Sequence, residues 1–184
     1  MIQHEPVTLE QVRQIVREEV ERAMKKDPAA RQACFIASKG TLDWAYPPLI
    51  LSTAAAAAGM SAAIFFTFYG LNIIRKDFER VLQVSPVGNP AMPMPIPMPD
   101  IVTALPGMKS MATSMMKSMF SKKGVASIRE LLDVARESEV RLIACQMTME
   151  VFGLKQEDFI DGVEFGGAAA FLSQARRAHV TLFI

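Results

Sequence analysis

The residue in this sequence best suited to chemistry is Cys145. It follows a short apolar run at 142–144 and precedes a run with helical spacing at 146–152, so the pattern changes from strand to helix at the cysteine. The first backbone N–H groups of a helix carry partial positive charge and favour the thiolate, the form of cysteine that attacks and carries sulfur. The pattern therefore predicts a nucleophilic thiol in a pocket that reagents can enter. The alternative it leaves open is a buried cysteine that behaves as a small hydrophobic residue.

Composition argues against several other kinds of chemistry. The 184 residues include 20 Lys and Arg against 19 Asp and Glu, a formal charge of +1, without the clusters of basic and aromatic residues typical of nucleic-acid binding, so we expect no nucleic-acid partner. His4, His179 and the two cysteines have no spacing that fits a metal site, and we expect neither a metal nor another cofactor. A polar N-terminus without a secretory signal, with only two cysteines, predicts a protein of the reducing cytoplasm.

The elements that must position Cys145 follow from the order of the apolar runs. Strand and helix patterns alternate along the chain, which predicts one α/β domain: a doubly wound, mainly parallel five-stranded sheet with helices on both faces, flavodoxin-like or Rossmann-like. Strands are predicted at 31–39, 62–68, 141–145, 159–164 and 180–184, and helices at 49–58, 71–83, 101–123, from 127, at 146–152 and from 168.

A long uncharged run complicates this interpretation. No charged residue occurs from Trp44 to Ile74, and a hydropathy window would score this stretch as a membrane span. Pro47-Pro48 and Gly59 divide it, however, into a helix of about a dozen residues and a buried strand, each too short to cross a bilayer. We therefore expect a β-α-β unit, with membrane contact as the alternative.

Two segments fall outside this core. Residues 1–28 begin with a capping box, Thr8 and Gln11, and predict an amphipathic helix that packs on a second copy of the chain or on its own sheet. The main domain is expected at 29–184 and contains an insertion at 85–124, a Met/Pro-rich loop followed by a Met-rich basic helix. That helix suits a membrane surface or a partner's groove, or else it is a lid packed on the domain's own core or at a subunit interface.

The simplest doubly wound strand order is 2-1-3-4-5, which places the first and third strands side by side. Ligands bind such sheets beyond the carboxyl ends of the strands, where the order reverses, and this rule places Cys145 in that crevice. Lys39 could hold an anionic sulfur species there by charge. The candidate substrate-binding residues around Cys145 are Lys39, Gly40, Thr41, Tyr69, Gly70, Gln146, Met147, Gly166 and Gly167.

Cys34 lies about five residues before the end of the first strand. At roughly 3.3 Å per residue it is on the order of 16 Å from Cys145, which is beyond disulfide reach. We therefore predict that Cys34 is buried and unreactive.

Five blocks of the sequence carry a resemblance to a known family. They are IASKGTLDWAYPPLIL (36–51), AIFFTFYGLN (63–72), VSPVGNPAMPMP (84–95), LPGMKSMATSMM (105–116) and LIACQMTMEVFGLKQEDFIDGVEFGGAAAFL (142–172). Together they resemble the DsrE/DsrF-like (DsrE/TusD) sulfur-relay family, in its branch with a Met/Pro-rich insertion, from about Phe35 to Ile184. The resemblance implies a doubly wound α/β subunit that forms homo-oligomers and carries sulfur as a persulfide or thiosulfonate. The family's sulfur-carrying cysteine maps onto Cys145, and the implied partner is a TusA-like carrier.

The leading hypothesis is therefore a cytoplasmic sulfurtransferase or sulfur carrier in which Cys145 takes sulfur from a donor and yields it to an acceptor cysteine. One alternative is a non-catalytic protein that docks on a membrane or a partner through the Met-rich basic helix. Another is a thiol redox sensor in which Cys145 is oxidised to the sulfenic acid.

Overall fold

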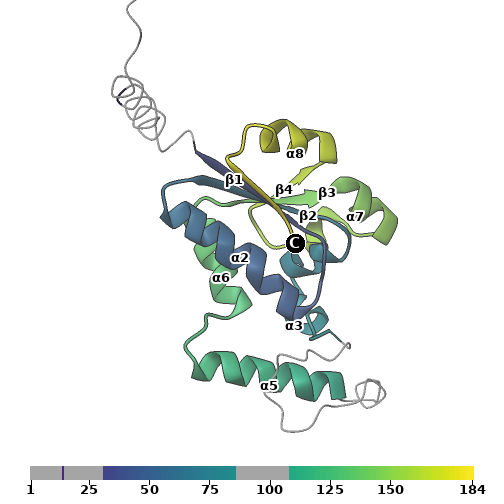
Figure 1. The fold of residues 1–184 in the computed structure, drawn as a ribbon. Coiled ribbons are helices and arrows are strands. Elements are labelled where there is room, and N and C mark those ends of the chain that lie inside the picture. Colours follow the sequence, from purple (N-terminus) through teal and green to yellow (C-terminus); the bar gives the residue numbers. More distant parts are fainter. Residues whose placement is uncertain (1–13, 15–30, 86–107) are drawn as a thin grey trace, which may run out of the picture.

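A computed structural model describes residues 31–85 and 108–184, together with Gln14. Apart from Gln14, the predicted N-terminal helix lies outside these residues, and so does the Met/Pro-rich stretch at 86–107. The described part of the chain folds into one five-stranded parallel sheet with helices on both faces (Figure 1), which confirms the predicted fold class.

The strand order across the sheet is β4-β3-β2-β1-β5, so the predicted order 2-1-3-4-5 is wrong. β2 and not β1 lies beside β3. Five of the six β2 side chains are buried, as an inner strand covered on both faces requires, whereas the predicted order would have left β2 at an edge. The strands are β1 (Gln32–Ala37), β2 (Ser61–Phe66), β3 (Arg141–Cys145), β4 (Val163–Gly166) and β5 (Val180–Phe183).

The helices divide between the two faces according to the direction of each crossover. From β1 to β4 the chain advances in one direction, and α2 and α6 cover one face of the sheet (Figure 1). From β4 the chain returns past the whole row to the far side of β1, and right-handed crossover places α8 on the opposite face. The helical segments are α2 (Leu42–Ala57), η2 (Phe68–Ile74, 3₁₀), α3 (Phe78–Val81), α5 (Met108–Lys122), α6 (Ile128–Glu137), α7 (Gln146–Phe152), η3 (Gln156–Asp158, 3₁₀) and α8 (Ala168–Ala175).

α2 begins at Leu42, five residues before the first turn predicted at Pro47-Pro48, and so contains both prolines in its interior. Its first turn is held by the core, because Leu42 is buried and its N–H donates to the Gln83 carbonyl at 2.9 Å. The uncharged run is thus divided between α2 and β2, as expected. Within the described ranges, no helix combines the length and apolarity needed to cross a membrane.

Two predicted elements around Phe159 are wrong in their bounds. The helix expected at 71–83 is broken at Arg75, which is extended and forms an isolated antiparallel bridge with Phe159. Phe159 is buried in that bridge and does not start a sheet strand, so β4 begins only at Val163. The bridge is a long-range contact that the local pattern does not encode.

α5, which lies in the insertion, and α6, which follows it, both pack on the domain itself. The predicted capping box of α6 is confirmed: the Glu130 N–H donates to Ser127 Oγ at 3.3 Å, and the Ser127 N–H donates to Glu130 Oε2 at 2.7 Å. α5 lies on the core through Phe120, whose ring centroid is 4.8 Å from that of Tyr46. The described part of the insertion thus matches the expectation of a helix packed on its own domain.

The loops after β1 and β2 meet backbone to backbone at two glycines. A Cβ on Gly40 would lie 2.0 Å from the Tyr69 carbonyl oxygen, and a Cβ on Gly70 would lie 2.0 Å from the Ala37 carbonyl oxygen. No larger residue fits without moving backbone. These two residues, expected to bind substrate, therefore have a packing role that by itself requires glycine.

We expect Gly40→Ala to lower the free energy of unfolding by about 3 kcal/mol, because its Cβ would push the two loops apart. Gly167→Ala is the matched control: the new Cβ meets nothing within 4 Å, so the change should stay within about 0.5 kcal/mol. Urea unfolding followed by circular dichroism measures both. Equal losses in the two variants would contradict the close-approach explanation.

Candidate functional site

Cys145 ends β3 and is the N-cap residue of α7, with φ −72° and ψ 109°. The strand-to-helix junction therefore lies where the sequence pattern predicts it. Cys145 pairs with Gly166, the last residue of β4. After β3 the chain enters α7, whose buried Met149 belongs to the core on the α2–α6 face, and after β4 it enters α8 on the other face. β3 and β4 are thus followed by helices on opposite faces, and Cys145 lies at the carboxyl edge between them. The strand order itself reverses between β1 and β5, so the expectation that Cys145 lies where the order reverses is wrong.

The thiol of Cys145 is nonetheless enclosed. Its side chain is 3% exposed and belongs to an apolar cluster on the α8 face that includes Phe65, Ile143 and Phe171. It makes no capping hydrogen bond to the N–H groups of α7. The expectation of a pocket that reagents can enter is therefore wrong for this conformation. The reason is tertiary: side chains alternate along β3, so Cys145 shares the face of Ile143, and α8 covers that face.

α8 is held over this cluster by one ring contact and one polar contact. Phe171 stacks on Phe65 with ring centroids 4.8 Å apart and an interplanar angle of 18°. Arg141, at the start of β3, donates through Nη1 to Oε1 of Gln174 on α8 at 2.6 Å. Its other nitrogens donate to Glu164 of β4 at 2.8 and 2.6 Å. These hydrogen bonds hold the pKa of Glu164 below its ordinary value, so the carboxylate stays charged beside the guanidinium.

The end of β2 contributes neighbours of Cys145 that the sequence analysis missed. Thr148 of α7 is buried; its hydroxyl accepts the Phe68 N–H at 3.3 Å and lies 3.2 Å from Thr67 Oγ1. Phe68 has a positive φ of 47°, a strained conformation for a bulky residue, and its side chain is 53% exposed. The sequence signal was a threonine directly after a fully apolar strand. These contacts fix the first turn of α7 against the end of β2.

The residues after β1 do not face Cys145. Since β2 lies between β1 and β3, the strand that leads into Lys39, Gly40 and Thr41 is two strand spacings, about 10 Å, from β3. Lys39 Nζ lies 3.2 Å from the ring centroid of Trp44, and Thr41 is the N-cap residue of α2 without a side-chain capping bond. The reason for placing these three residues beside Cys145, that the first and third strands are neighbours, is wrong.

Four of the other predicted residues do border Cys145. Gln146 and Met147 follow it at the start of α7, and both are exposed. Gly166 pairs with it across β3 and β4, and Gly167 is the N-cap residue of α8. Tyr69 lies further out, 64% exposed, with its ring centroid 5.6 Å from that of Phe152 at the end of α7.

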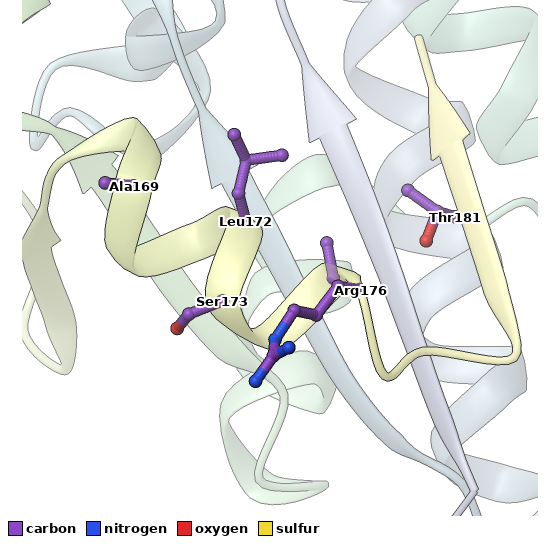
Figure 2. A pocket seen from close by; sticks show the side chains of 6 residues that line it. Ala169, Leu172, Ser173, Arg176 and Thr181 are labelled. Carbon is purple, nitrogen blue, oxygen red and sulfur yellow. The ribbon is translucent and has the colours of Figure 1, made fainter.

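A depression of about 710 Å³ lies beside α8, away from Cys145. Figure 2 shows α8 on one side of it, with Leu172, Ser173 and Arg176, and Thr181 of β5 on the other. Its lining includes Ala175, which also belongs to the cluster around Cys145. Cys145 is not among the residues that line it, and β2 and β1 lie between the strand of Cys145 and β5.

Cys34 is fully buried in β1, as predicted. It shares the α8 face with Cys145, but β2 separates the two strands and the cysteines differ in level by four residues, which gives a separation of about 16 Å. Burial raises the pKa of the Cys34 thiol, against a smaller lowering by the charge of Arg141.

Comparison with known proteins identifies the family. Residues 29–183 match the model of the DsrE/DsrF/DrsH-like family, and the chain belongs to that family. The resemblance in the sequence is therefore confirmed.

The chain matches two curated relatives over nearly their whole length. The chain is 50% identical over 158 residues to the sulfur carrier protein DsrE2 of Allochromatium vinosum, a match that covers 84% of this chain and 98% of that protein. It is 29% identical over 160 residues to the uncharacterized protein YrkE of Bacillus subtilis, a match that covers 84% of this chain and 97% of that protein. The crystal structure of the ychN protein from E. coli aligns with a TM-score of 0.46 and 12% identity, over 83% of this chain and 99% of that one.

We expect Cys34 to stay unmodified by maleimide at pH 8 until the whole protein unfolds, because it is fully buried and its raised pKa keeps the thiol protonated. Peptide mass spectrometry after timed labelling across a urea series measures each cysteine separately. Labelling of Cys34 and Cys145 at equal rates without denaturant would contradict this.

We expect Thr148→Val to lower the free energy of unfolding by about 1–3 kcal/mol, because it keeps the shape but leaves the Phe68 N–H without its acceptor. Thr53→Val is the control, since the Thr53 hydroxyl bonds only to carbonyls of its own helix. Urea denaturation of both variants provides the measurement, and a loss no larger for Thr148 than for Thr53 would refute the role of this hydroxyl.

Proposed function

We propose that this protein is a sulfur carrier that binds sulfur covalently on Cys145. The observation that carries the proposal is the 50% identity to a sulfur carrier protein over 98% of that protein's length. The position of Cys145 supports it, because the residue ends a strand at the carboxyl edge of a parallel sheet, the edge where such folds place their chemistry.

The transfer is a pair of thiol exchanges. The Cys145 thiolate attacks the outer sulfur of a donor persulfide or polysulfide, the S–S bond of the donor breaks, and the electron pair leaves with the donor thiolate. The sulfur is then held on Cys145 as a persulfide. An acceptor thiolate attacks that outer sulfur in turn, and Cys145 leaves as the thiolate, so the cycle needs no external oxidant or reductant. Gln146 and Met147 follow Cys145 in the chain, Gly166 pairs with it and Gly167 comes next, and these are the residues we propose to line the path of the sulfur.

We further propose a TusA-like carrier as the exchange partner, and assembly of the protein with copies of itself. The edge strand β5 supports self-assembly: its outer side is unpaired in the described chain, and Val180, Leu182 and Phe183 are 39%, 41% and 72% exposed. An apolar edge strand of this kind is usually covered in the working state of a protein.

A docking function has one observation in its favour. α5 exposes Met111, Met115 and Met119 along one side, beside exposed Lys117 and Lys122, a surface that suits an acidic partner or an anionic membrane. Docking requires no reactive thiol, so the reaction of Cys145 with a sulfur donor distinguishes a sulfur carrier from a docking protein. The sensor hypothesis uses the same thiol but adds oxygen in place of sulfur.

We expect incubation with inorganic polysulfide to add the mass of one or more sulfur atoms to the native protein, and dithiothreitol to remove it. Cys145→Ser should abolish the adduct, whereas Cys34→Ser should keep it, since Cys34 is fully buried. Intact-protein mass spectrometry provides the measurement. An adduct that persists in Cys145→Ser, or none in the wild-type protein, would rule out Cys145 as the carrier, and an oxygen adduct with peroxide alone would favour the sensor.

A further inference from the structure

We propose that α8 is a hinged cover over Cys145, which swings toward β5 to admit a sulfur donor and closes over the loaded thiol. This inference rests on the proposed sulfur-carrier function, because it concerns access to the same thiol. The need for movement follows from burial: Cys145 is 3% exposed, and its Sγ must be reached along the line of the S–S bond that breaks.

Of the elements around Cys145, α8 is the one free to move. β2 and β4 are joined to β3 by backbone hydrogen bonds on either side, and α2 and α6 lie on the other face of the sheet. α8 has only eight residues, and only Phe171 and Ala175 of it are buried. Elements with few buried apolar contacts open locally at a free energy well below that of global unfolding.

The hinge is the pair Gly166-Gly167, which joins β4 to α8. A Cβ on Gly166 would meet Ile143 at an ordinary 3.5 Å, and one on Gly167 would meet nothing within 4 Å. Gly167 has φ −88°, which any residue adopts. The closed structure therefore gives no packing or backbone reason for glycine at 166 and 167, in contrast to Gly40 and Gly70. A movement of α8 gives one, because glycine lets the backbone between β4 and α8 change its φ and ψ angles at low steric cost.

The space needed for the movement is already present. The depression of about 710 Å³ lies between α8 and β5, with Leu172 and Arg176 on its α8 wall and Thr181 on the opposite wall (Figure 2). A displacement of α8 in this direction carries Phe171 away from β3. It therefore uncovers Cys145 without breaking any strand pairing.

The latch that closes the cover is the bond from Arg141 to Gln174. Opening breaks this one hydrogen bond of 2.6 Å, while Arg141 keeps both bonds to Glu164. The guanidinium thus stays paired with its carboxylate in the open state, and the amide of Gln174 turns to water. Opening leaves no charge buried without a partner, which keeps its cost low.

The test is the rate at which maleimide labels Cys145 in the native full-length chain, read by peptide mass spectrometry. Gln174→Ala removes the latch and should speed labelling about three- to tenfold. Ser173→Ala is the neighbouring control, because the Ser173 hydroxyl bonds only to a carbonyl of α8 itself. Gly167→Ala stiffens the hinge and should slow labelling about two- to fivefold.

A second pair of variants tests the direction of movement. Thr181→Trp fills the depression with a side chain on an exposed strand position, so it should slow labelling by obstructing α8. Val180→Trp is its control, because alternation along β5 places Val180 on the other face. Retained circular dichroism and urea midpoints show that each variant folds.

Three results would overturn the cover. They are wild-type labelling as fast as that of an unfolded cysteine peptide, labelling whose urea dependence equals that of global unfolding, and equal rates in the test and control variants. None of these readouts uses sulfur transfer. If the latch and hinge variants change the labelling rate of Cys145 but Cys145 takes up no sulfur from polysulfide, the carrier function is wrong and the cover stands. If Cys145 takes up sulfur but the variants leave its labelling rate unchanged, the cover is wrong and the carrier function stands.

Discussion

The stacking of Phe171 on Phe65 is the contact on which the arrangement around the thiol depends. It is the main apolar attachment of α8 to the sheet, and in the described chain α8 is the helix that covers this face. Without it the face that carries Cys145 would be open to solvent along three strands. This aromatic pair thus contributes to the burial of Cys145.

The carboxyl edge of the sheet is rigid on one side of Cys145 and loosely built on the other. Toward β1, Gly40 and Gly70 bring two loops into backbone contact, and Thr148 ties α7 to the end of β2. Toward β4, Gly166-Gly167 make no close contact that requires glycine. With the movement that we propose for α8, the thiol keeps a fixed position at a strand end while access to it changes.

Local features of the structure could be predicted from the sequence, and long-range ones could not. The capping box at Ser127 and the strand-to-helix junction at Cys145 depend on a few adjacent residues, and both are correct. The strand order depends on which faces the crossover helices cover, and the alternation of strands and helices does not specify that. One signal was available: the continuous apolar run in β2 is typical of an inner strand, which argues against placing it at an edge. Because the predicted strand order was wrong, the sequence analysis placed the end of β1, and with it Lys39, directly beside β3.

Burial of the thiol, which sequence patterns could not predict, is compatible with carrying sulfur. A persulfide exposed to solvent exchanges with any passing thiol, so a carrier must shield its sulfur between donor and acceptor as well as expose it at each end. Cys34 and Cys145 lie in the same apolar cluster on the same face, and only Cys145 lies at a strand end beside a glycine pair. The difference between the roles that we propose for them follows from their strands, because a displacement of α8 toward β5 keeps Cys34 of β1, the strand next to β5, covered, whereas it uncovers Cys145 at the end of β3.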